Sequence, residues 1–160
     1  MNLELYYLSF AASLHVLAVV IWVGGMFFAY MALRPAAEKL LEPSARISLW
    51  SHALSKFFIW VWAAIIIIPI TGYWMIFSSF NEFSGVTWNI HIMQMLGVVM
   101  ILIFLHVFFV PFSRLQKAVN ERDYQKGGKN LAQIRRLVGL NLAIGLLTIV
   151  VAVGFKHVLL

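Results

Sequence analysis

Histidines are the residues of this sequence best suited to chemistry, and most of them lie within long apolar segments. They are His15, His52, His91, His106 and His157. Ionisable side chains are costly inside a bilayer and tend to mark functional sites there. Neutral imidazole binds haem iron, copper and zinc. The histidines therefore predict a metal or cofactor site, and their depth in the membrane decides which of them can share it.

Depth can be counted along each helix from the basic residues that flank the apolar segments. On this count His15, His91 and His157 lie about 28 to 34 Å from the basic end of their segments, at about 1.5 Å per residue. Three helices thus bring a histidine to one outer level. We predict that His15 and His91 are the axial ligands of a b-type haem near the periplasmic face, with His157 as a substitute ligand or a hydrogen-bond donor to a quinone. His106, with His52, would mark a second site nearer the basic end.

The residues around His15 favour a flat cofactor. Residues three and four apart share a helix face, so Ala11 and Ala18 flank His15, and Trp22 follows two turns along. Small side chains leave room for a planar macrocycle, although they also suit close packing of two helices. The spacing therefore predicts that Ala11, Ala18 and Trp22 line a cofactor site around His15.

Amide and thioether side chains in the apolar segments open alternatives. Gln94 and Asn141 can hydrogen-bond a quinone such as ubiquinone, or can bond neighbouring helices to one another. Met93 and Met95 follow His91, and thioether sulfur together with imidazole suits cuprous ion. Copper is therefore the alternative to haem.

Two absences narrow the chemistry further. The chain has no cysteine, which excludes disulfides, thiolate metal sites and covalent haem attachment. Its four long apolar runs contain no Asp or Glu, which excludes a carboxylate proton relay in the membrane. Imidazole, amide, aromatic and thioether groups remain, and these suit a redox cofactor or a soft metal ion.

The elements that must position these residues are membrane helices. Hydrophobic residues make up 62% of the 160 residues and charged residues 11%, against roughly a half and a quarter in soluble proteins. Four apolar segments are long enough to cross a bilayer, which takes about 17 to 25 residues. We predict helices at about 5–33, 55–80, 86–113 and 135–157. Together they form an all-α integral membrane protein, a single four-helix transmembrane domain over residues 1–160.

The basic residues predict the orientation of this bundle. Nearly all Lys and Arg residues lie in the connections 34–56 and 114–136, and cytoplasmic loops retain basic residues. Both termini are therefore predicted on the periplasmic side of a bacterial inner membrane. The positive charge is explained by topology and anionic lipid, not by nucleic acid. The predicted partners are lipid, a quinone and an electron donor or acceptor, and small residues on the helices allow a homodimer.

Three stretches resemble the copper resistance protein D (CopD) family and its relatives, the HemJ-type protoporphyrinogen oxidases. They are 15–25 (HVLAVVIWVGG), Thr71-Gly72 and 136–145 (RLVGLNLAIG). The resemblance implies four membrane helices and, in the HemJ-type branch, a b-type haem at the histidine that corresponds to His15. Our main hypothesis is a haem-dependent quinone oxidoreductase or electron-transfer protein. The alternatives are copper transport or copper resistance, and protoporphyrinogen oxidation.

Overall fold

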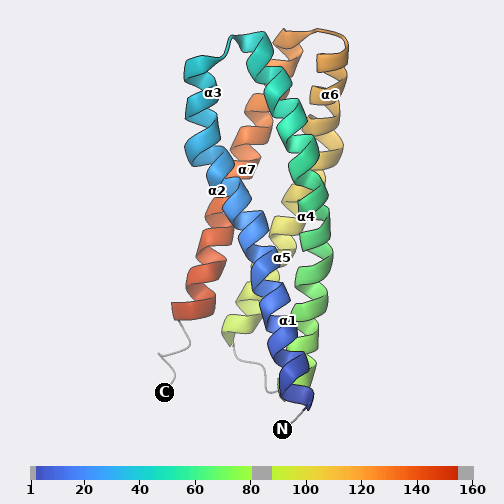
Figure 1. Cartoon of the computed structure of the whole chain (residues 1–160), viewed down its shortest axis with the longest axis vertical. Coiled ribbons are helices and arrows are strands. Elements are labelled where there is room, and N and C mark those ends of the chain that lie inside the picture. Colours follow the sequence, from blue (N-terminus) through green and yellow to red (C-terminus); the bar gives the residue numbers. More distant parts are fainter. Residues whose placement is uncertain (1–2, 81–87, 155–160) are drawn as a thin grey trace.

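The computed structural model describes residues 3–80 and 88–154, which form helices joined by short turns. The described residues form four long helical rods, which lie side by side (Figure 1). The first rod consists of α1 (Leu3–Val19), η1 (Val20–Gly24), α2 (Gly25–Phe28), η2 (Ala29–Leu33) and α3 (Arg34–Leu40). The second is α4 (Pro43–Phe80), the third is α5 (Trp88–Val107), η4 (Phe108–Phe112) and α6 (Ser113–Asn120), and the fourth is α7 (Tyr124–Gly154). All four rods are long and apolar enough to cross a membrane, which confirms the predicted all-helical fold.

The rods extend beyond the predicted helices at one end of the bundle. The first rod continues to Leu40, α4 begins at Pro43, α6 ends at Asn120 and α7 begins at Tyr124. The predicted bounds followed the apolar runs, because apolar residues mark the part of each helix that lipid can cover. Polar and charged residues outside those runs still form good helix, so the helices end at turn residues instead.

Proline accounts for two of the three π-helical turns within residues 3–80 and 88–154. Proline has no backbone N–H, so it cannot donate the regular helical hydrogen bond to the residue four positions earlier. Pro35 lies in the first turn of α3, directly after η2, and Pro111 lies inside η4. A π-helical turn absorbs such a defect without ending the helix. The rods therefore stay continuous across the apolar interior.

The turn between α6 and α7 is closed by an acidic cap. Arg122 adopts a left-handed backbone with φ 57°. The backbone N–H of Lys126 donates to Oδ1 of Asp123 (3.0 Å), and Nζ of Lys126 lies 3.0 Å from Oδ2. This backbone N–H, with the ammonium group, holds the pKa of Asp123 below its usual range. The cap satisfies a donor that the start of α7 would otherwise leave free.

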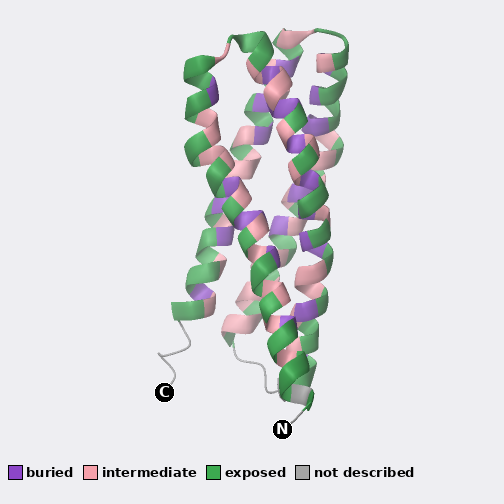
Figure 2. Ribbon diagram, viewed as in Figure 1, coloured by how far each residue is buried: buried purple, intermediate pink, exposed green. Residues whose placement is uncertain are grey.

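Aromatic rings fill the centre of the bundle. Phe58 contacts Phe112 edge to face with ring centroids 4.8 Å apart, and Phe104 contacts both Phe58 (5.4 Å) and Trp22 (6.3 Å). Figure 2 shows buried positions along the inner sides of the rods and exposed positions on their outer sides. Many exposed side chains are large and apolar, so the outer faces suit contact with lipid.

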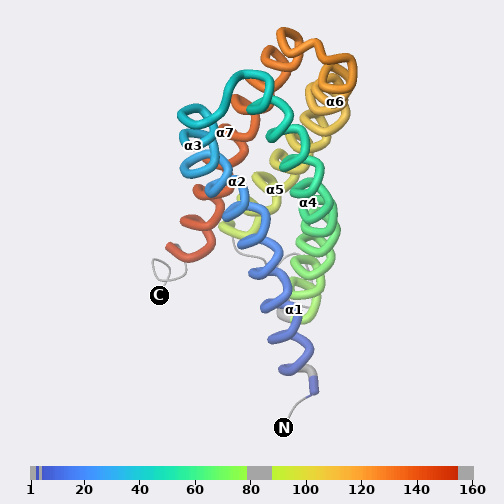
Figure 3. Tube along the Cα trace, turned by 45° about the horizontal axis from the view of Figure 1, so that its top comes forward, coloured from blue at the N-terminus to red at the C-terminus, as the bar shows by residue number. Residues whose placement is uncertain are grey.

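The two ends of the bundle differ in charge. The turns from α3 to α4 and from α6 to α7 lie together at one end, which we call the basic end (Figure 1). The beginning of α1 and the end of α7 lie at the other, which we call the termini end. Figure 3 shows α1 and α7 diverging there, because α1 packs chiefly on α4 and α7 packs chiefly on α5. Which end faces the cytoplasm stays a prediction.

Adjacent glycines of the first rod provide a test of this packing. A Cβ on Gly25 would overlap the ring of Phe57, whereas a Cβ on Gly24 would meet nothing within 4 Å. We predict that Gly25→Ala destabilises the protein by about 1 to 3 kcal/mol through overpacking. Gly24→Ala should leave stability unchanged or slightly raised, since alanine favours helix. Thermal unfolding of both variants in detergent measures the difference, and equal transition temperatures would contradict the packing described.

Candidate functional site

A stripe of residues on the first rod faces the interior of the bundle. It consists of Ala11, His15, Ala18, Trp22 and Met26, and we call it the inward stripe. Steps of three and four residues keep these side chains on one helix face. His15 is half-buried, and the other four are buried. The predicted neighbours of His15 therefore lie on its own face, and the small side chains of Ala11 and Ala18 are buried in the bundle.

His15 is held by a threonine of the second rod. Its Nδ1 lies 2.9 Å from Oγ1 of Thr71, which is 56 residues further along the chain. Thr71 is only 6% exposed, and its hydroxyl donates to the backbone oxygen of Ile67 at 2.6 Å. A hydroxyl has a single proton, so Oγ1 can only accept from His15. Nδ1 of His15 therefore carries the proton, by this assignment of the network, and Nε2 keeps its lone pair.

The backbone of α4 closes one side of the His15 ring. A Cβ added to Gly72 would lie 3.4 Å from Cε1 of His15, which is ordinary van der Waals contact. The ring is therefore fixed by a hydrogen bond to Thr71 and by packing at the next residue. Metal-binding histidines are commonly oriented by a hydrogen bond at the second ring nitrogen, and His15 has this arrangement.

A second polar contact lies deeper along the inward stripe. Nδ2 of Asn141 in α7 lies 3.9 Å from Sδ of Met26. Asn141 is 3% exposed, and its Oδ1 is buried without a hydrogen-bond partner among the described residues. A small apolar cavity adjoins this pair, and Trp22, Phe58 and other apolar side chains line it. The arrangement presents a soft thioether and a free amide oxygen inside the bundle.

A second buried thioether approaches the same helix. A Cβ on Gly145, one turn along α7 from Asn141, would lie 3.1 Å from the methyl carbon of Met100. Met100 and Met26 are both buried. Thioether sulfur is a ligand type for cuprous ion. The interior of the bundle therefore contains two side chains, Met26 and Met100, that are of a type able to bind this ion.

The remaining predicted residues lie elsewhere. His91 is exposed in the first turn of α5, and His52 and His106 are also exposed. Met95 is 61% exposed, whereas Met93 and Gln94 are half-buried. His157 lies outside the described residues. Among the described residues, no group of three or more His, Asp or Glu side chains could hold a metal ion. The pairing of His15 with His91 stays a prediction.

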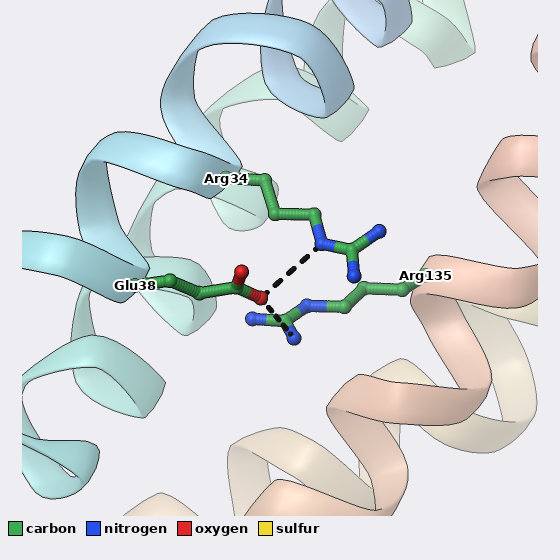
Figure 4. Close-up of polar contacts among 3 residues, drawn as sticks. All are labelled: Arg34, Glu38 and Arg135. Atoms are coloured by element: carbon green, nitrogen blue, oxygen red, sulfur yellow. Dashed lines mark hydrogen bonds and ion pairs between the residues drawn. The ribbon is translucent and has the colours of Figure 1, made fainter.

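Sequence reasoning missed a charged cluster at the basic end. Oε1 of Glu38 accepts hydrogen bonds from Nε of Arg34 (3.2 Å) and from Nη1 of Arg135 (2.9 Å), as Figure 4 shows. The four-residue spacing of Arg34 and Glu38 is a signal that could have been used. Nothing local could have added Arg135, which is 97 residues from Glu38.

Comparison with known proteins gives one match. The family model described as "Copper resistance protein D" matches residues 51–155, which is about two thirds of the chain. The matched part contains Thr71, Gly72 and Asn141 but not the first rod. No curated protein and no solved structure matches the chain. A relation to HemJ-type oxidases therefore rests on the sequence resemblance alone.

The unpaired oxygen of Asn141 leads to a prediction about stability. An unsatisfied buried acceptor is unfavourable, so Asn141→Leu should stabilise the protein by about 1 kcal/mol. Asn141→Ala should instead destabilise it, because a cavity remains. Thermal unfolding of both variants in detergent measures whether each substitution raises or lowers stability. A clear loss of stability in Asn141→Leu would mean that Oδ1 has a structural partner.

Proposed function

The chain belongs to the copper resistance protein D family, and we propose that it carries copper ions in the membrane with His15 as the first ligand. The hydrogen bond between His15 and Thr71 carries this proposal. It fixes the tautomer in which Nε2 is unprotonated, and a neutral imidazole nitrogen is a good copper ligand. Copper is the cargo here, so its site must release the ion as well as bind it.

The inward stripe supplies a route from His15 into the bundle. Met26 is eleven residues after His15 on the same face, or about 16 Å further along the helix. There the thioether of Met26 meets the amide of Asn141. Imidazole followed by thioether suits the cuprous state. We therefore propose that a cuprous ion binds first at His15 and then at Met26, with Thr71 as a positioning residue.

Reconstituted protein tests this proposal directly. The purified full chain in phosphatidylcholine vesicles should carry cuprous ion, kept reduced by ascorbate, to an indicator inside. His15→Ala should lower the rate at least tenfold, because the first ligand is lost. Thr71→Val keeps the shape but removes the hydroxyl, and should lower the rate several-fold. Thr71→Ser should restore most of it.

An exposed histidine provides the matched control. His106→Ala also removes one imidazole from a membrane helix, but His106 lies outside the inward stripe. The copper transport rate of His106→Ala should stay within about twofold of the rate of the unchanged chain. Equal rates for His15→Ala and His106→Ala would overturn the role of His15.

A b-type haem at His15 is the second candidate. The unprotonated Nε2 would equally serve as an axial ligand, and Thr71 would then orient that ligand. The two candidates differ in their spectra. A reduced-minus-oxidised spectrum of protein produced with ample haem should be featureless if copper is the cargo. Sharp b-type bands that disappear in His15→Ala would instead support haem and electron transfer.

A further inference from the structure

The basic end holds more positive charge than its acid can balance. Arg34 and Arg135 both donate to the single oxygen Oε1 of Glu38 (Figure 4). Arg46 adds a third positive charge that acts on Glu38 and Arg135. Three arginines therefore surround one carboxylate, and the cluster keeps a net positive charge between the first rod, α4 and α7.

Several donors in this cluster have no acceptor. Nε and Nη2 of Arg135 are buried and lack a hydrogen-bond partner among the described residues, and so does Nε1 of Trp50. Trp50 is 5% exposed. The guanidinium carbon of Arg135 lies 5.9 Å from the centre of the Trp50 ring, so the two side chains are neighbours. Buried donors are nearly always paired in folded proteins, and this group therefore fits an additional acceptor.

The space beside these donors has apolar walls. Arg34, Trp50 and Arg135 line a cavity. Most of its other walls are apolar side chains, among them Leu54, Phe57 and Ile134. The surface that these side chains present to the cavity is apolar, and the unpaired donors are buried beside it. An inorganic anion would use only the donors, whereas an amphipathic anion would use the walls as well.

We propose that the arginine cluster beside this cavity binds the phosphate group of an anionic phospholipid. Nε and Nη2 of a guanidinium present two parallel N–H groups that match two phosphate oxygens. The indole N–H of Trp50 supplies a third donor, and an acyl chain lies against the apolar walls. Arg135 lies two residues before Leu137, where the apolar part of α7 begins, and we expect lipid headgroups at this level. Basic pockets between membrane helices suit such headgroups.

Lipid binding to the purified full chain tests the site. Native mass spectrometry from a neutral detergent would count retained phosphatidylglycerol and phosphatidylcholine at equal lipid concentrations. The unchanged chain should bind phosphatidylglycerol at least tenfold more tightly. Arg135→Gln should remove this preference, and Trp50→Phe, which keeps the ring but removes the N–H, should weaken it several-fold. Arg136→Gln is the matched control, because it removes a neighbouring exposed arginine and should change binding by less than twofold.

Glu38→Gln separates lipid binding from a purely structural ion pair. Removing this carboxylate frees donors and raises the positive charge, so phosphatidylglycerol should bind as tightly as before or more tightly. If the cluster only joins helices, Glu38→Gln and Arg135→Gln should instead act alike. Equal binding of the two lipids, or an Arg135→Gln variant that binds like Arg136→Gln, would overturn the proposal. Inorganic phosphate that displaces phosphatidylglycerol at equal concentration would show a free phosphate site and overturn the lipid assignment.

Discussion

The hydrogen bond between Nδ1 of His15 and Oγ1 of Thr71 is the constraint on which the functional account depends. Water is scarce inside a bilayer, so polar groups there must find partners within the protein. The hydroxyl proton of Thr71 is already donated to the backbone of its own helix. Oγ1 can then only accept, and the imidazole must present its unprotonated nitrogen elsewhere. The hydroxyl proton of Thr71 therefore determines that Nε2 of His15 is unprotonated and can bind a metal ion.

Polar contacts join the first rod to its neighbours at three levels. His15 meets Thr71 near the termini end, Met26 meets Asn141 in the middle, and Glu38 meets Arg135 at the basic end. Apolar side chains gain little by leaving lipid for a helix interface, so such contacts help to set the register between membrane helices. The π-helical turns η1 and η2 lie between these levels. Each turn changes the rotation of the residues that follow it.

The sequence predicted the parts that depend on local pattern. Apolar runs were enough for four membrane helices, and helical spacing was enough to place Ala11, Ala18 and Trp22 on the face of His15. Thr71 could not be foreseen as its partner, because 56 residues separate them. His91 is exposed, and its rotation was unpredictable because α5 is apolar on all sides. Imidazole serves iron and copper alike. The small residues beside His15 favoured haem at the level of sequence, whereas the family match favours the copper alternative.

The nature of the copper ligand at His15 is the most direct test of the account. X-ray absorption at the copper edge of the purified chain, loaded with one equivalent of cuprous ion, reports whether imidazole binds the metal. We expect an imidazole scattering signal in the unchanged chain and in Thr71→Ser. In His15→Ala that signal should be lost, and sulfur scattering from a thioether should appear in its place. An imidazole signal that persists unchanged in His15→Ala would contradict the central claim.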